Sequence, residues 1–318
     1  MRVEGEDGMT RPLADGAAAS IDERHPPIKP RRVTFDWSKT PLHWVPGDPV
    51  ATHIINSFHI VLPEGEKWFI QCVKDARPHI KDERLLEEIK GFIGQEMVHA
   101  RSHQGVLDQI LERAGIDVSK ITDAAARGNA ERPAQMAALK ERNPRAWRRR
   151  LRFELAAVAS IEHYTAVLGQ WIMDNERFEK SGVDPTMLDL LRWHGAEEVE
   201  HRSVVFDVYK AMGGGYATRV AAWTVSLFFL YWALIGGSLY LLKHDPTIKR
   251  RVTPLRVYRS YRRSVRLGHV PGIFKLLLGE APVYLKPNHH PSKVCSTPRA
   301  LEYLKRSPAA KAAGYDPY

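Results

Sequence analysis

Two Glu-x-x-His motifs constrain the fold of this chain more than any other feature of its sequence. Glu96 and His99 lie in the segment GQEMVHARSHQ, and Glu198 and His201 lie in WHGAEEVEHRSVV. Residues three positions apart lie on the same side of an α-helix, and apolar residues recur at helical spacing around both motifs. We therefore expect each motif to direct its carboxylate and its imidazole into the protein core.

Two more helices are expected to supply one inward glutamate each. Glu162 lies in AVASIEHYTAVLG, and Glu66 lies in PEGEKWF, where Glu64 is the alternative. A buried carboxylate is costly unless positive charge compensates it. Four converging carboxylates balance two divalent ions, and helical bundles bind such pairs with one glutamate from each of two helices and Glu-x-x-His from the other two. The sequence therefore predicts a dinuclear metal site.

Several neighbouring residues leave the ligand set partly open. His194 precedes Glu198 by four residues and shares its side of the helix, so we include it. Glu197 would replace Glu198 if that helix were rotated. His103 and His163 are expected to be structural histidines of the core or the surface. The predicted metal ligands are Glu66, Glu96, His99, Glu162, His194, Glu198 and His201.

The ligand types indicate which metals to expect. Carboxylates and imidazoles without thiolates suit iron and manganese and also accept zinc. The chain has two cysteines, Cys72 and Cys295, which are far apart and form no Cys-x-x-Cys motif. A disulfide framework or a thiolate metal site is therefore not expected. We expect two iron ions, with manganese or zinc as the alternatives.

The segments PEGEKWFI, GQEMVHARSHQ, SIEHYTA and WHGAEEVEHRSVVFD carry a resemblance to known families. Over about residues 40–290 the chain resembles the bacterial family of predicted metal-dependent hydrolases. Its ligand order is also similar to that of the ferritin-like di-iron proteins. His194 resembles the third histidine that binds iron on the last bundle helix of arylamine N-oxygenases such as p-aminobenzoate N-oxygenase, and that likeness implies a seventh protein ligand.

We expect an enzyme whose two iron ions activate O₂ to oxidise or oxygenate an apolar or aromatic organic substrate, with an external electron donor. The first alternative is a dinuclear metal-dependent hydrolase that uses a bridging hydroxide, because the same ligand types serve hydrolysis. The second alternative is a non-catalytic iron-binding protein or a membrane-associated scaffold.

The fold class predicted from the apolar spacing is all-α: a ferritin-like four-helix bundle with an additional long apolar helix and a basic C-terminal extension. Helices are expected over residues 48–79 with a bend or break near Pro63, and over residues 82–114, 147–180 and 184–212. Residues 115–146 are expected to hold short helices. The expected divisions are an extended or disordered arm (1–47), the di-metal bundle (48–215), the apolar helix (216–243) and the basic extension, which packs on the bundle (244–318).

The net charge of +10 does not indicate a nucleic-acid partner. Residues 243–318 hold 16 Lys and Arg against 4 Asp and Glu, so the positive excess lies beyond the bundle, and no nucleic-acid-binding motif is present. A basic segment of this kind is attracted to anionic lipid headgroups. The N-terminus has no apolar segment of the secretory type, so we expect a cytoplasmic protein.

Residues 220–242 form an uncharged apolar stretch that is long enough to span a bilayer. A single crossing would place the basic extension on the far side, against the positive-inside tendency. We therefore expect this helix to be re-entrant or to lie on the inner face of the cytoplasmic membrane, or to be buried against the bundle or in a homodimer interface.

Overall fold

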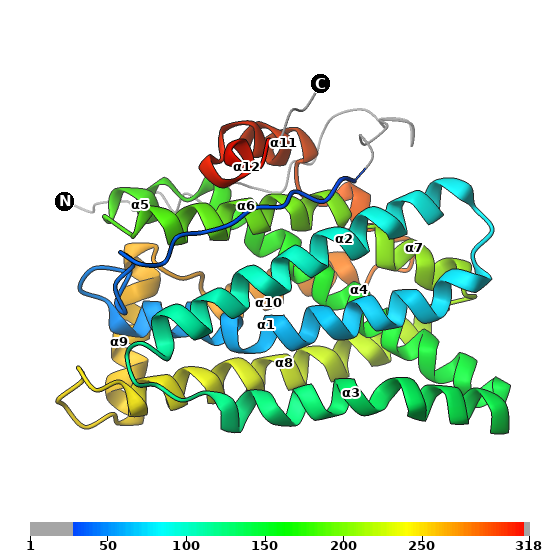
Figure 1. Cartoon of the computed structure of the whole chain (residues 1–318), viewed down its shortest axis with the longest axis horizontal. Coiled ribbons are helices and arrows are strands. Elements are labelled where there is room, and N and C mark those ends of the chain that lie inside the picture. Colours follow the sequence, from blue (N-terminus) through cyan, green and yellow to red (C-terminus); the bar gives the residue numbers. More distant parts are fainter. Residues whose placement is uncertain (1–27, 315–318) are drawn as a thin grey trace.

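The computed structural model describes residues 28–314, and all regular structure in that range is helical. This confirms the all-α class. Residues 1–27 of the expected N-terminal arm lie outside the described range. Residues 28–48 contain no helix and run as an extended segment across α2 and α6 in Figure 1. Trp37 and Trp44 of this segment are fully buried, so it is part of the core.

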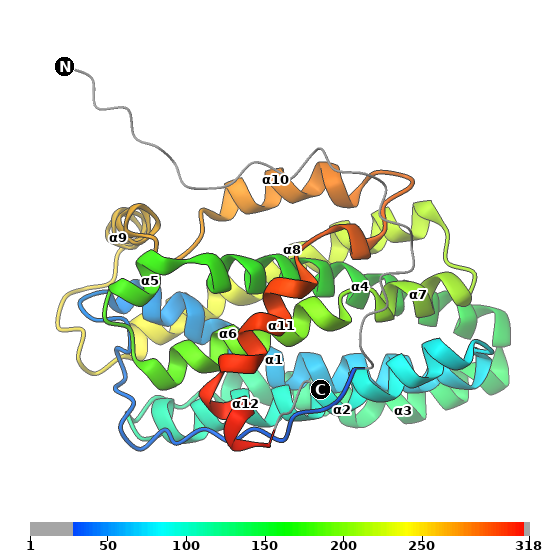
Figure 2. The ribbon, with the colours of Figure 1, turned by 90° about the horizontal axis from the view of Figure 1, so that it is seen from above.

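Four long helices carry the predicted metal ligands. They are α1 (Pro49–Ala76), α2 (Glu83–Val106), α4 (Pro144–Asp174) and α6 (Pro185–His201). Each begins where an Asp or Asn side chain accepts a hydrogen bond from a backbone N–H three residues later; these caps are Asp48, Asp82, Asn143 and Asp184. Such caps satisfy N–H groups that have no partner within the helix. In Figures 1 and 2 the four helices lie along one another, with α1 against α2 and α4 against α6.

Several helix boundaries differ from those expected from the sequence. α1 runs through Pro63 without a break, because it packs along α2 and α8, and tertiary packing outweighs the missing backbone hydrogen bond. Residues 115–146 hold one long helix, α3 (Ser119–Arg142), rather than several short ones. A π-helical turn (Leu107–Leu111) follows α2. The last bundle segment is split into α6 and α7 (Val204–Ala211), and α5 (Glu176–Lys180) follows α4.

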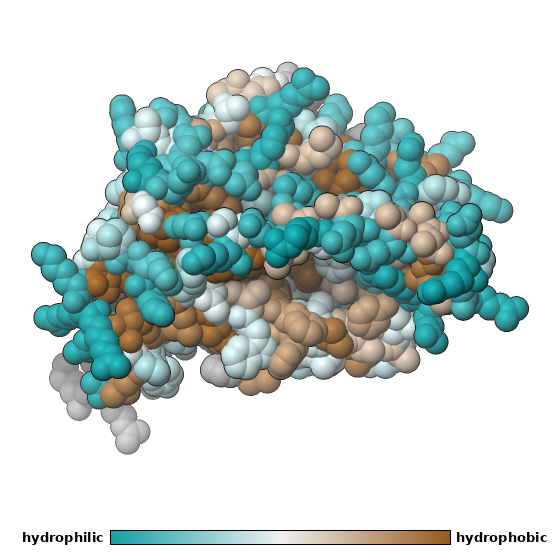
Figure 3. All heavy atoms as spheres, turned by 60° about the horizontal axis from the view of Figure 1, so that its bottom comes forward, coloured by the Kyte–Doolittle hydropathy of each residue, from teal (hydrophilic) through white to brown (hydrophobic). Residues whose placement is uncertain are grey.

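The long apolar helix α8 (Tyr216–His244) packs against α1 and α4 on one side. Its other side carries exposed aromatic residues, of which Phe229 is 66% exposed and Trp232 is 61% exposed. Within residues 28–314, it is the one helix long and apolar enough to cross a membrane by length and composition. Apolar surface is visible on the lower part of the face in Figure 3.

The basic C-terminal part is also mainly helical. It contains α9 (Pro254–Leu267), α10 (Ile273–Tyr284), α11 (Thr297–Arg306) and α12 (Pro308–Ala312), with single 3₁₀ turns at Pro291–Lys293 here and at Arg77–His79 after α1. α11 and α12 lie across α6 (Figure 2). Asp189 of α6 holds them there, since it accepts hydrogen bonds from Tyr303, Ser307 and the backbone of Ala309.

A buried carboxylate also connects the C-terminal end of α8 to the N-terminal end of α1. Asp245, directly after α8, lies 2.8 Å from Nε2 of His53 on α1 and 2.6 Å from Nε2 of His43. The buried Ser57 and Ser238 hydroxyls meet at 3.2 Å a few residues further along the same pair. These contacts show that α1 and α8 run antiparallel, and they fix the register between the two helices.

The close contact between α4 and α6 depends on two glycines, which gives a first prediction. A Cβ atom at Gly169 would lie 2.3 Å from the carbonyl oxygen of Gly195. Gly169→Ala is expected to lower the free energy of unfolding by about 1–3 kcal/mol, because neither backbone can move away. Gly236→Ala in α8, where nothing lies within 4 Å, should instead stabilise by up to about 1 kcal/mol. Urea unfolding of both variants distinguishes them; equal losses would contradict the packing argument.

A second prediction concerns acid stability. Burial, together with the nearby His163 and Arg219, lowers the pKa of His289 to about 3. At a pH below the unfolded-state pKa of about 6.5, His289 is protonated in the unfolded chain but remains neutral in the folded protein. The free energy of unfolding therefore falls as the pH falls, by about 1.4 kcal/mol per pH unit for one such group. His289→Leu should remove that slope from unfolding curves measured between about pH 4 and 6.5. An unchanged slope would show that His289 takes up its proton in the folded state.

Candidate metal centre

All seven predicted metal ligands are buried and come together inside the helical assembly. They lie on α1 (Glu66), α2 (Glu96, His99), α4 (Glu162) and α6 (His194, Glu198, His201). The least buried of them, His194, is 7% exposed. Since the four helices lie side by side, one inward residue from each reaches the same region.

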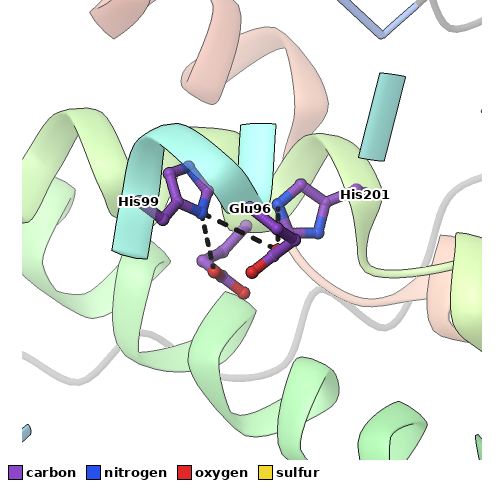
Figure 4. Close-up of side chains that lie close together, drawn as sticks. Glu96, His99 and His201 are labelled. Atoms are coloured by element: carbon purple, nitrogen blue, oxygen red, sulfur yellow. Dashed lines mark ion pairs between the residues drawn. The ribbon is translucent and has the colours of Figure 1, made fainter. Parts of the chain in front are cut away.

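One group of four ligand-type side chains forms the middle of the centre. One atom each of Glu96, His99, Glu198 and His201 lies within 4.8 Å of the others. Nδ1 of His99 is 3.7 Å from a carboxylate oxygen of Glu96 and equally far from one of Glu198, and Nε2 of His201 is 3.3 Å from Glu96. Figure 4 shows Glu96, His99 and His201 pointing toward one another from α2 and α6.

A second group adjoins the first and shares His99 with it. It consists of Glu66, His99 and His194. Nε2 of His194 lies 3.7 Å from Glu66 and 2.8 Å from Glu198. Glu162 joins from the side of His201, whose Nδ1 is 2.8 Å from one of its oxygens. The two groups therefore adjoin within one continuous cluster of ligand-type side chains, with His99 as their common member.

The polar atoms that point into this region fit divalent metal ions. Both carboxylate oxygens of Glu66 and of Glu96, Oε1 of Glu162, Nδ1 of His99 and Nε2 of His201 are buried and have no hydrogen-bond partner among the described residues. Buried polar atoms are normally paired, because leaving them unpaired is costly. These atoms are all carboxylate oxygens and imidazole nitrogens, the donors that Fe, Mn and Zn accept.

The electrostatics of the protein side chains also favour a cation. Burial raises the pKa of Glu66 and Glu162 well above the ordinary carboxyl value, and neighbouring carboxylates raise it further. Burial would also raise the pKa of Glu198, but the imidazoles of His201, His194 and His99 outweigh it and lower the pKa to about 2. The carboxylates therefore compete for too little positive charge, which bound cations would supply.

Outer contacts hold His99 in place. Its Nε2 donates to Glu197 at 2.9 Å, which leaves Nδ1 directed at the centre. Glu197 also accepts hydrogen bonds from Trp193 and from Arg31 of the extended segment. Glu197, the alternative to Glu198, therefore lies behind a ligand rather than beside it. A carboxylate in this position fixes the tautomer and orientation of a metal-binding histidine.

His194, His103 and His59 form a row of hydrogen-bonded imidazoles that begins at the centre. Nε2 of His103 is 2.9 Å from Nδ1 of His194, and Nδ1 of His103 is 2.7 Å from Nδ1 of His59. We expected His103 to be structural and did not identify His59, although it precedes Glu66 by seven residues, two helical turns, and so lies on the same side of α1. His163 lies elsewhere: its ring packs against Tyr284 and His289.

The centre adjoins a large cavity of about 1030 Å³. His59, His103, His194, Glu198 and Thr165 line it, and the Thr165 hydroxyl donates a hydrogen bond to Glu198. Sequence reasoning did not identify Thr165, because a threonine in a helix carries no distinctive pattern. Most of the remaining wall is apolar. The centre is therefore accessible to an organic molecule that fills this cavity.

Comparison with known proteins identifies one related family. The model of the family described as predicted metal-dependent hydrolase matches residues 29–294. No curated protein and no solved structure matches the chain.

The family match corrects the function expected first from the sequence. The prediction of an enzyme that activates O₂ to oxidise its substrate is wrong, because the matching family is described as predicted metal-dependent hydrolases, and hydrolysis uses water rather than O₂. The error has a chemical cause. Carboxylate and imidazole ligands serve oxidative and hydrolytic sites alike, so ligand type alone does not separate the two reactions.

The support that Glu197 gives to His99 yields a third prediction. Glu197→Gln should weaken the binding of Mn²⁺ or Zn²⁺ by about 10–100-fold in calorimetric titrations, as is typical when such a supporting carboxylate is lost. Glu200→Gln is the matched control. Glu200 lies on the same helix and also binds Arg31, yet its other hydrogen bond is to Gln95 and not to a histidine of the centre. Equal losses of metal affinity in the two variants would show that the loss comes from the contact with Arg31 and not from the hydrogen bond to His99.

Proposed function

The chain belongs to the family of predicted metal-dependent hydrolases, and from that premise we propose that it hydrolyses an ester or a phosphoester with the help of two divalent metal ions. The supporting observation is the convergence of seven buried ligand-type side chains at the inner end of an apolar cavity. We further propose that α1, α2, α4 and α6 form a bundle of the ferritin-like type, since each supplies one glutamate.

The ions would be held by Glu66, Glu96, His99, Glu162, His194, Glu198 and His201. When bound, they would supply Lewis acidity, which polarises a carbonyl or phosphoryl group and makes water more acidic. In the overall reaction, the oxygen of water forms a bond to the acyl carbon or the phosphorus. The bond to the leaving oxygen breaks, and that oxygen takes a proton.

The row of imidazoles determines where a proton is held beside the substrate. When Nε2 of His194, which faces Glu66 and Glu198, is unprotonated, its Nδ1 carries the proton and donates to Nε2 of His103. His103 then donates from Nδ1 to His59, which keeps its own proton on Nε2. Burial lowers the pKa of His59 to about 3, so this ring stays neutral. We propose that His59, a residue of the cavity wall, donates this N–H to a substrate oxygen.

The apolar walls exclude bulk water from the reacting bond, which strengthens each polar contact near the centre. Thr165 fixes one oxygen of Glu198 through its hydroxyl. Only the groups at the inner end are therefore available to orient the bond that is cleaved.

For location, we propose the inner face of the cytoplasmic membrane. The exposed aromatic residues of α8 and the arginines of α9 support this position, since apolar and basic side chains together bind an anionic lipid surface. α8 packs along α1 and α4, so it would lie against the bilayer rather than cross it. A homodimer that covers the same face of α8 is the alternative.

The fourth prediction tests hydrolysis. Protein reconstituted without oxygen with Mn²⁺, Zn²⁺ or Fe²⁺ should bind about two ions per chain and cleave p-nitrophenyl esters or phosphoesters, and a chelator should abolish the activity. Glu66→Gln should reduce turnover by at least about 100-fold, because it removes a ligand rather than a supporting side chain. The readouts are metal content and release of p-nitrophenol.

Glu64→Gln is the matched control for Glu66→Gln. It makes the same charge change two residues away on α1, but Glu64 binds Lys67 and Asn129 and takes no part in the centre. Its turnover should remain that of the wild type. Turnover that persists after metal removal, or that requires O₂, would contradict the proposed function.

A further inference from the structure

The shape of the cavity limits what can reach the metal centre. Its volume of about 1030 Å³ lies at the upper end for small-molecule sites. α8 lines it from Leu227 to Lys243, a span of about 24 Å at 1.5 Å per residue. The cavity is therefore long as well as large.

The two ends of the cavity can be placed from contacts of α8. At one end, Ser226 bonds to Ser160, two residues before Glu162, so Leu227 lies level with the metal centre. At the other end, Asp245 bonds to His53, which precedes Glu66 by more than three helical turns. The centre is therefore at the inner end, and Lys243 marks the outer end.

The side chains between the two ends are almost entirely apolar. Ile55, Leu62, Leu168, Leu191, Leu230 and Leu234 are among them. The one carboxylate in the described wall is Glu198, at the inner end. A ligand that fills the cavity must therefore have a long apolar body and no charge along it.

The outer end has the opposite character. Lys243, Lys249, Arg250 and Arg251 line it and are exposed, and no ion pair is described for any of the four within residues 28–314. Four cations without acidic partners at one end of an apolar cavity are complementary to an anionic group on the ligand.

We infer that the substrate is an anionic amphiphile: an elongated apolar molecule whose acidic group stays at these four cations while its other end carries the ester or phosphoester bond to the centre. This assignment of substrate class rests on the proposed hydrolytic function. It places the cleaved bond at the end of the molecule remote from the acidic group.

The bilayer is the source that the structure favours. Residues of α8 such as Leu230 and Leu234 line the cavity, while Phe228, Phe229 and Trp232 of the same helix are 58–66% exposed. Ile235 and Leu239 both line the cavity and are more than 40% exposed, so the cavity wall continues into the outer apolar surface. An amphiphile leaving a membrane would therefore meet apolar surface along its whole path.

The fifth prediction is a binding experiment that needs neither metal nor turnover. A fluorescent long-chain fatty acid should bind metal-free protein with one site per chain. Saturated fatty acids should displace it, with affinity falling about fourfold for each methylene removed, since each buried methylene contributes about 0.8 kcal/mol. A long-chain alcohol of equal length should compete at least about tenfold more weakly, because it lacks the acidic group.

Two triple variants with the same change in net charge test the basic end. Lys249→Ala, Arg250→Ala and Arg251→Ala together should weaken fatty-acid binding at least about tenfold. Arg259→Ala, Arg263→Ala and Arg266→Ala together alter exposed arginines of α9 that do not line the cavity, and should leave the affinity for the fatty acid within about twofold of the wild type. Leu234→Trp, which fills the cavity, should abolish binding, with circular dichroism confirming the helix content.

Vesicles distinguish the two sources of the ligand. Transfer of the probe from phosphatidylglycerol vesicles to the protein should slow at least about tenfold when Phe228, Phe229 and Trp232 are replaced by Ser, while binding of the free probe stays unchanged. Unchanged transfer would show that the amphiphile is taken from solution, and would overturn the membrane source.

The outcomes separate the substrate class from the reaction. If the affinity does not depend on the chain length of the fatty acid, or falls equally in both triple variants, the proposal of an anionic amphiphilic substrate is overturned, even if simple esters are cleaved. Chain-dependent binding to a protein that hydrolyses nothing with any of the three metals would instead overturn the hydrolytic function and leave the ligand assignment standing.

Discussion

Acidic side chains from four different helices are buried at one place, and this burial constrains how the helices pack. Glu66, Glu96, Glu162 and Glu198 are each at most 3% exposed, and carboxylates this close repel one another strongly in a medium of low dielectric constant. Histidines from α2 and α6 offset part of the repulsion, and the unpartnered oxygen atoms indicate that cations offset the remainder. The helices therefore pack around a centre that favours positive charge, and metal binding is expected to be coupled to the stability of the bundle.

The extended segment before α1 contributes to this centre although it contains none of its ligands. Arg31 bonds to Glu197, and Glu197 bonds to His99, so a residue far from the motifs in sequence orients a predicted ligand. On the opposite side, α8 closes the cavity that gives access to the centre. The outer layers therefore orient a predicted ligand and line the cavity beside the centre, while the four central helices supply the predicted ligands themselves.

Much of the fold and of the candidate site followed from local patterns. Helical spacing of apolar residues predicted the long helices, and the two Glu-x-x-His motifs with Glu66 and Glu162 predicted the residues that the structure brings together. The errors in the fold arose where distant contacts outweigh local preference. α1 continues through Pro63 because neighbouring helices hold it, and α3 runs unbroken over residues 119–142, where several short helices were expected. His59 and Thr165 were missed because their roles depend on which helix faces them.

The helical class, the apolar stretch of residues 220–242 and the set of acids and histidines that must share a core all follow from local patterns, since they depend on periodicity and residue type along a single helix. The tertiary structure decided that Glu197 supports His99 while Glu198 faces the centre, and that one side of α8 lines a cavity while the other is exposed. The physical reason is the same in both cases. A local pattern defines the sides of a helix, but only packing against other helices decides what each side meets.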